Sequence, residues 1–372
     1  MRTDLVIERF EPDRAARAGF AAYHDVVKAC QAADRPGEPT LPLEELIGRL
    51  KKPMPGMGRA VHWVGLRHRD VVAVAEVFLL DEENSDIAMV NVKVHPEHRR
   101  AGIGSALLCA ILPELKAQER RVIEGGDVVA GTAGQLWADA VGFRQVRRVV
   151  RQALITATAD RTRWDVPVPG GYRLEYWEGT APENLIESYA LARGAIRDAP
   201  LGDSGYRWPE YTVERVRAAE AELRSQSMLQ RLVVAVHEAS GAVAAFTELC
   251  VHPRRPDWGY QRDTAVVAEH RGNGLGRCVK AHMLRRLVTD APEVRWISTT
   301  TGAENMHMIR VNDEVGYTTL PTLIAVQGEL TAVEARLGAV RRSPAVRSRI
   351  DRPGNGSGDR QRGTSGRVAD GS

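Results

Sequence analysis

EHRRAGIG at residues 97–104 is followed 172 residues later by EHRGNGLG at residues 269–276, and five of the eight positions are identical. Beyond these segments the spacing grows by two, and VGF at 141–143 meets VGY at 315–317. A repeat of this length predicts two versions of one domain. At the spacing of 172 residues, further identical pairs are Val71 with Val243, Glu76 with Glu248, Val94 with Val266, Leu112 with Leu284 and Leu115 with Leu287.

Length and charge fit two folded domains with a basic extension. A chain of 372 residues is long enough for two hydrophobic cores. Eight arginines against three aspartates give residues 339–372 a charge of +5, so residues 1–338 carry about −2 of the total of +3. The extension has no aromatic residue and is rich in Gly, Ser and Arg, which predicts disorder. The folded part offers no basic surface, so nucleic acid is not an expected partner.

The distribution of apolar residues and of cysteines indicates the cellular compartment in which the protein is expected. No apolar run approaches the roughly 18 residues of a membrane span, and the N-terminus lacks the apolar core of a signal peptide. We therefore expect a cytoplasmic monomer or homodimer with reduced thiols, no metal and no membrane association. The scattered cysteines that match no zinc-binding spacing are Cys30, Cys109, Cys250 and Cys278.

Hydrophobic periodicity predicts the same order of elements in both halves. A linker is expected at 156–171, where Pro and Gly cluster, which gives domains at 1–155 and 172–338 and a tail at 339–372. In the first half the predicted helices are 13–30, 42–51, 105–118 and 132–142, and the predicted strands are 5–12, 62–68, 71–80, 87–96 and 122–129. In the second half the predicted helices are 183–196, 212–226, 277–289 and 304–315, and the predicted strands are 172–179, 232–238, 242–251, 261–270, 294–301 and 317–330.

In each half a β-rich run passes through R-x-x-G-x-G directly into a helix. Glycines in such a turn permit positive φ and let a ligand approach the backbone, while the N–H groups and dipole of the helix N-terminus favour an anion. Phosphate or pyrophosphate is the expected ligand. The dinucleotide motif fails because Leu107 and Val279 replace its third glycine, and Walker A fails because no Gly-Lys-Ser/Thr follows.

What remains resembles motif A of the GNAT superfamily of acyl-CoA N-acyltransferases. The segments are VKVHPEHRRAGIGSALL at 92–108 and TAVVAEHRGNGLGRCVK at 264–280, and the resemblance covers most of both halves. The tandem arrangement is similar to that of the bacterial mycothiol synthase family. The resemblance implies an α+β fold of two GNAT-like domains. Each would have a mixed, mainly antiparallel sheet flanked by helices and splayed open between its fourth and fifth strands.

The resemblance also implies acetyl-CoA as the acyl donor. Two strand edges would hydrogen-bond the pantetheine arm, and two glycine turns would hold the pyrophosphate. The implied residues are Val92, Lys93, Val94, Arg99, Arg100, Ala101, Gly102, Ile103, Gly104 and Ser105 in the first half, and Thr264, Ala265, Val266, Arg271, Gly272, Asn273, Gly274, Leu275, Gly276, Arg277 and Asn305 in the second.

The family's usual catalytic groups are missing from both halves. The strand position that often carries a glutamate base holds Ala88 and Tyr260, and the position of the tyrosine acid holds Ala138 and Asn312. Substitutes are found mostly in the second half, where the candidate catalytic residues are Asp263, Glu248, Asn312 and Tyr260.

We therefore interpret the chain as an acyl-CoA-dependent N-acyltransferase. It would transfer acetyl by direct attack of a small-molecule amine, with the second domain catalytic and the first cofactor-binding or structural. Two alternatives stay open at this point: a non-catalytic CoA-binding or interaction protein, and an acyltransferase that uses a carrier-protein or aminoacyl-tRNA donor.

Overall fold

The computed structural model describes residues 5–53 and 56–342. The N-terminal half contains β1 (Leu5–Phe10), α1 (Arg17–Asp34), α2 (Leu43–Lys51), β2 (Arg59–Arg67), β3 (Asp70–Leu79), β4 (Ile87–Val94), α3 (Ile103–Ala117), β5 (Val122–Val129), α4 (Ala133–Ala140) and β6 (Arg144–Ile155). The C-terminal half contains β7 (Tyr172–Glu178), α5 (Ile186–Arg193), α6 (Val213–Ser225), β8 (Leu229–His237), β9 (Val243–His252), β10 (Arg255–Val266), α7 (Leu275–Asp290), β11 (Trp296–Gly302), α8 (Met306–Glu314), β12 (Thr318–Thr319), β13 (Leu323–Glu329) and α9 (Leu330–Arg342).

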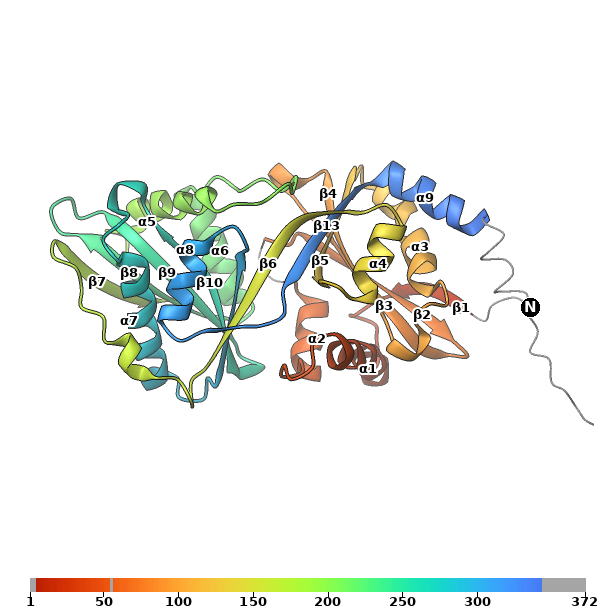
Figure 1. The fold of residues 1–372 in the computed structure, drawn as a ribbon, viewed down its shortest axis with the longest axis horizontal. Helices are drawn as coiled ribbons and strands as arrows, with labels where there is room; N and C mark the ends of the chain where they lie inside the picture. The colour runs from red at the N-terminus through yellow and green to blue at the C-terminus, as the bar shows by residue number, and fades with distance from the viewer. Residues whose placement is uncertain (1–4, 54–55, 343–372) are drawn as a thin grey trace, which may run out of the picture.

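The two halves have the predicted α+β architecture, with mainly antiparallel strands and helices on both faces of the sheet (Figure 1). In the N-terminal half, α1 and α2 cover one face, while α3, α4 and α9 cover the other. The predicted strand at 317–330 is wrong in one respect, because Pro321 lacks a backbone N–H and divides it into β12 and β13. No helix among the described residues is long and apolar enough to cross a membrane.

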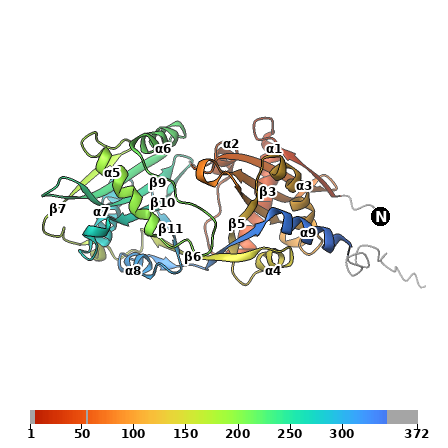
Figure 2. The same ribbon diagram turned by 90° about the horizontal axis from the view of Figure 1, so that it is seen from above.

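The halves share one sheet through exchanged strands. Within the described residues, the strand order is β1-β2-β3-β4-β5-β13-β6-β11-β10-β9-β8-β7, with β12 beside β6. Strand β13 thus lies between β5 and β6 in the N-terminal half, although it comes from the end of the chain. In the same way, strand β6 of the N-terminal half lies between β11 and β12 in the C-terminal half. Figure 2 shows β6 and its neighbours at the junction of the halves.

The register makes the exchange symmetric. Val149 and Leu323 occupy equivalent positions of the repeat, and they pair with each other, so a local pseudo-twofold axis passes between them. The flanking pairs obey the same symmetry: Val122 pairs with Glu329, and Trp296 pairs with Ile155. Each half therefore obtains one inner strand from the other.

The core of the N-terminal half depends on the C-terminal end of the chain. Ile324, Val326, Leu330, Val333 and Leu337 pack in the same cluster as the buried face of α3. The division into domains at 156–171 stays a prediction, but elements cross it in both directions. Helix α9 extends to Arg342, into the segment predicted to be a disordered tail, and residues 343–372 lie outside the described residues.

Removing one side chain of α9 should therefore destabilise the N-terminal half. Leu337 is 2% exposed, so Leu337→Ala is expected to cost about 2–5 kcal/mol of unfolding free energy. Native-state hydrogen exchange should show the loss of protection in α3 and β5. Thr331→Ala, on the exposed face of the same helix, is the matched control. Loss of protection confined to residues after 172 would contradict the exchange of strands between the halves.

Candidate functional site

Each half has a backbone cradle at the start of a long helix. Gly102 and Gly274 precede α3 and α7 with φ of 76° and 73°, and neither helix start has a side-chain cap. A Cβ placed on either glycine would meet no atom within 4 Å. The amide groups are thus accessible, and the helix dipole favours an anion there. The N-terminal copy is more strained because Arg100, with φ of 65°, replaces the glycine found at 272.

The arginine that begins each turn anchors it to the protein. Arg99 donates through Nε to the carbonyl of Val94 and forms two bonds, of 2.8 and 2.7 Å, with the carboxylate of Asp34. Arg271 repeats this with the carbonyl of Val266 and the carboxylate of Asp198. The two guanidinium groups thus hold the strand and the turn in place. The backbone amides of the turn are the groups that could bind a pyrophosphate.

The sheet is splayed beside both cradles. Strand β4 pairs with β5 only from Ile87 to Met89, and β10 pairs with β11 only from Trp258 to Tyr260. The segments 92–94 and 264–266 remain paired on their other edge, with β3 and β9 respectively. Each segment therefore presents an edge to the gap, where a pantetheine arm could add as a strand.

The two helix starts differ in the side chains that lie against them. Trp137 of α4 lies 3.5 Å from a Cβ placed on Gly104, and its Nε1 donates to Ser105 Oγ at 3.1 Å. A Cβ placed on Gly276 meets only the side chain of Val266, at 3.7 Å. The start of α7 is therefore more accessible than the start of α3.

The second half carries a carboxylate on a β-bulge. Gln261 pairs with Leu249 but Thr264 with Thr247, so β10 has one extra residue at Arg262–Asp263. The equivalent β4 pairs with β3 in continuous register. A bulge re-aims a side chain locally, and it places Asp263, which is 27% exposed, directly before the free edge at 264–266.

Arg193 brings Asp263 and Glu248 together. Its guanidinium donates to Glu248 Oε2 at 2.9 Å and to Asp263 Oδ2 at 3.0 Å. Burial alone would raise the pKa of Glu248, but the charges of Arg262 and Arg193 outweigh it and lower that pKa to about 2. A carboxylate with so low a pKa accepts a proton poorly at neutral pH. This geometry favours Glu248 as the group that holds Arg193.

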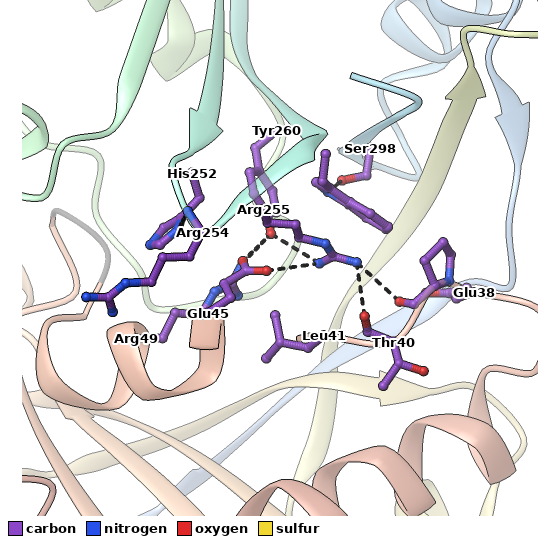
Figure 3. Close-up of polar contacts among 12 residues, drawn as sticks. Glu38, Thr40, Leu41, Glu45, Arg49, His252, Arg254, Arg255, Tyr260 and Ser298 are labelled. Atoms are coloured by element: carbon purple, nitrogen blue, oxygen red, sulfur yellow. Dashed lines mark hydrogen bonds and ion pairs between the residues drawn. The ribbon is translucent and has the colours of Figure 1, made fainter. Parts of the chain in front are cut away.

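Tyr260 lies at the interface between the halves (Figure 3). Its hydroxyl donates to Glu45 Oε1 of α2 at 2.6 Å and accepts a bond from Arg49. Arg255 completes the cluster with an ion pair of 3.4 Å to Glu45 and bonds to the carbonyls of the 35–42 loop. Burial raises the pKa of Tyr260 to about 12, so the phenol is engaged in a structural network.

The two candidate asparagines have structural partners. Asn312 is fully buried, and its Nδ2 donates to Gln152 Oε1 of the exchanged strand at 2.8 Å. Asn305 caps α8, because its Oδ1 accepts from the amide of Met308 at 3.1 Å. The structure thus gathers Asp263 and Glu248 but places Asn312 and Tyr260 apart from them.

Sequence reasoning missed Arg193, the residue that organises this site. A signal was present, because Glu248 lies within the apolar run AVAAFTELCV and a buried carboxylate needs a cationic partner. The position of that partner could not be predicted, since Arg193 is 55 residues away in the chain. Among the described residues no group of three or more His, Cys, Asp or Glu side chains could hold a metal ion.

Comparison with known proteins agrees with this geometry. Residues 25–129 match the model of the acetyltransferase (GNAT) family. Two curated relatives named mycothiol acetyltransferase are each 27% identical: that of Saccharomonospora viridis over 276 residues, covering 72% of this chain and 80% of the relative, and that of Kineococcus radiotolerans over 306 residues, covering 80% and 91%. A solved tandem GNAT protein from the clavulanic acid biosynthesis pathway has a TM-score of 0.72 at 24% identity, covering 88% of this chain and 98% of that one.

The shared fold and the paired cradles define a tandem GNAT-fold protein. The family match identifies a GNAT acetyltransferase domain within residues 25–129, and the names of the curated relatives support an N-acetyltransferase. The predictions of fold and of enzyme class are confirmed. Acetyl-CoA is the acyl donor of this family, and the uncapped helix starts and splayed strands provide a fitting site for it.

A buried lysine distinguishes the core behind the second cradle. Lys280 of α7 is 1% exposed, and its Nζ lies 5.5 Å from the centre of the Tyr317 ring. The equivalent pair in the first half is Leu108 and Phe143, both buried. Burial lowers the pKa of Lys280 to about 7. This amine is therefore close to half neutral at physiological pH.

Lys280→Met should stabilise the C-terminal half and flatten its dependence on pH. The folded protein holds fewer protons than the unfolded chain between pH 7 and the ordinary lysine pKa of 10.5, so stability should rise with pH in that window and the penalty should be complete below pH 7. Denaturant unfolding at pH 7 should show a gain on the order of a few kcal/mol. Lys28→Met, at an exposed position, is the control, and equal pH profiles for the wild type and Lys280→Met would refute the assignment.

Proposed function

We propose that the protein transfers acetyl from acetyl-CoA to an amine of a small molecule, and that the C-terminal half carries this reaction. The relatives' name, mycothiol acetyltransferase, supports a small-molecule acceptor. The start of α7 at Gly276 supports the choice of half, because Trp137 lies against the equivalent Gly104 and no aromatic residue lies against Gly276.

The observation that carries the proposal is the placement of Asp263. Its carboxylate lies on the bulge of β10, partly exposed, one residue before the edge on which the pantetheine would lie. Asp263 would receive the acceptor amine there and take up its proton. Arg193 orients Asp263, and Glu248 fixes Arg193 in turn.

Direct attack fits the state of the nearby thiols. Cys250 is fully buried, and burial raises its pKa, with a further contribution from Glu248. Cys278 is also buried, and burial raises its pKa. Protonated, inaccessible thiols are poor nucleophiles, so a covalent acyl-cysteine is not favoured. The amine nitrogen would bond to the acetyl carbon as the carbon–sulfur bond breaks, with one proton leaving nitrogen and one reaching sulfur.

The division of labour can be tested with a matched pair of variants. Gly274→Val should lower turnover at least tenfold, because its side chain would enter the space needed by the pyrophosphate and would strain a left-handed residue. Gly102→Val introduces the same strain at the equivalent position and should spare most of the turnover. CoA release with a panel of small amines is the measurement. Equal losses would contradict the assignment to the C-terminal half.

Asp263→Asn tests the amine-binding carboxylate. It should lower kcat/KM by roughly 100-fold or more, because the amide cannot accept the proton, while acetyl-CoA still binds by calorimetry. Asp257→Asn, an exposed change on the same strand, is the control. Full activity of Asp263→Asn would rule out this role.

A further inference from the structure

A second carboxylate lies at the splay of the N-terminal half. Glu124 of β5 pairs with Met89, the last residue at which β4 and β5 remain together. Its neighbour Ile123 points into the core with α3, so Glu124 points to the opposite face, that of α1 and α2. The side chain is half-buried. It thus lies beside the position that a thioester would take if the donor followed the free edge at 92–94.

The contact partners of Glu124 are neutral. Ser204 Oγ donates to Oε2 at 2.8 Å, and Gln327 Nε2 donates to the same atom at 3.1 Å. Burial raises the pKa of Glu124, although Ser204, the charge of Arg147 and Gln327 act against it. Glu38 and Glu248, by contrast, contact arginines at 2.5 and 2.9 Å. A half-buried carboxylate held by neutral donors favours a cationic ligand on its other oxygen.

Two residues without side chains follow Glu124. Gly125 and Gly126 follow it on β5, where the repeat places Thr299 and Thr300 in the other half. A Cβ on Gly126 would meet no atom within 4 Å. A Cβ on Gly125, which points to the other face, would lie 3.1 Å from Val326, so the open space lies on the face of Glu124.

The C-terminal half supplies a fixed wall of this site. The loop between α5 and α6 crosses to the N-terminal half, where the amide of Asp203 donates to the Val146 carbonyl at 2.8 Å. Gly202 has a φ of +61°, and a Cβ there would lie 2.4 Å from the same carbonyl oxygen, so a side chain is excluded. The amide of Arg207 donates to Asn84 Oδ1 at 2.8 Å. Ser204 is thus held in place by contacts on both sides of it.

From these contacts we propose that Glu124 is the amine-binding carboxylate and general base of a second acyl-transfer centre in the N-terminal half, with Ser204 and Gln327 as its positioning residues. The inference rests on the proposed function for its donor, acetyl-CoA. The ligand is a small primary amine. The amine binds as its ammonium ion, Glu124 takes one proton from it, and the neutral nitrogen bonds to the acetyl carbon as the carbon–sulfur bond breaks. The nitrogen then releases its second proton to solvent, and the sulfur gains a proton from solvent.

The experiment uses the full chain with Gly274→Val, which silences the C-terminal cradle. CoA release and calorimetric binding are measured with butylamine, 2-phenylethylamine and spermidine. A residual turnover should remain, and adding Glu124→Gln should lower it about 100-fold, as expected for loss of a general base, and weaken amine binding at least tenfold. Adding Ser204→Ala should weaken amine binding although this residue lies in the other half. Adding Glu329→Gln, an exposed change on β13, is the control.

The outcomes separate this inference from the proposed function. Equal residual activity and amine binding with Glu124→Gln and Glu329→Gln would overturn the second centre, as would the absence of both in the Gly274→Val background. If Gly102→Val abolishes turnover and Gly274→Val spares it, the assignment to the C-terminal half fails while the Glu124 centre stands. Retained folding of Glu124→Gln is checked by its circular dichroism and thermal unfolding, so that loss of activity reports on the carboxylate.

Discussion

The pairing of β6 with β13 is the constraint on which the rest of the structure depends. At its centre Val149 lies opposite Leu323, its own counterpart in the repeat. Because an inner strand of a sheet must be paired on both edges, neither β5 nor β11 would be satisfied by its own half alone. The two cores are therefore completed reciprocally, and the chain folds as one sheet in spite of its two-domain sequence.

This exchange determines what surrounds each splay. It brings Gln327 beside Glu124 and Gln152 beside Asn312. It also brings each half's loop between its first two helices onto the other half, so that the Pro39 carbonyl accepts a bond from Arg255 in one direction and Ser204 contacts Glu124 in the other. The side chains near each cofactor site thus contact residues of both halves.

The sequence predicted what is local or repeated. The glycine turns and the helix starts behind them follow from backbone requirements that any copy of the fold must meet, so the spacing of 172 residues was enough to find them. The free strand edges were expected from the resemblance to the GNAT superfamily. The strand exchange was not predictable, because Leu323–Glu329 reads equally well as a strand of its own half. The partners of the site were missed for the same reason: Arg193, Glu45 and Ser204 act across 55, 215 and 80 residues of sequence.

The carboxylates show how the two halves have diverged. Glu248 and Glu76 hold the same place in the repeat, yet Glu248 is neutralised by Arg193, whereas Glu76 lies 3.9 Å from Lys93. At the apex of the splay the relation reverses, because the first half has Glu124 where the second has Ser298, whose hydroxyl accepts a bond from Trp258. The carboxylate proposed as proton acceptor thus lies on β10 in the second half and on β5 in the first, and β11, the equivalent of β5, is the strand next to β10. Both positions border the gap in which the donor would lie, so under these two proposals each half keeps a proton acceptor although the family's usual base is absent. In the first half, that acceptor contacts Ser204 and Gln327, which come from the opposite half of the chain.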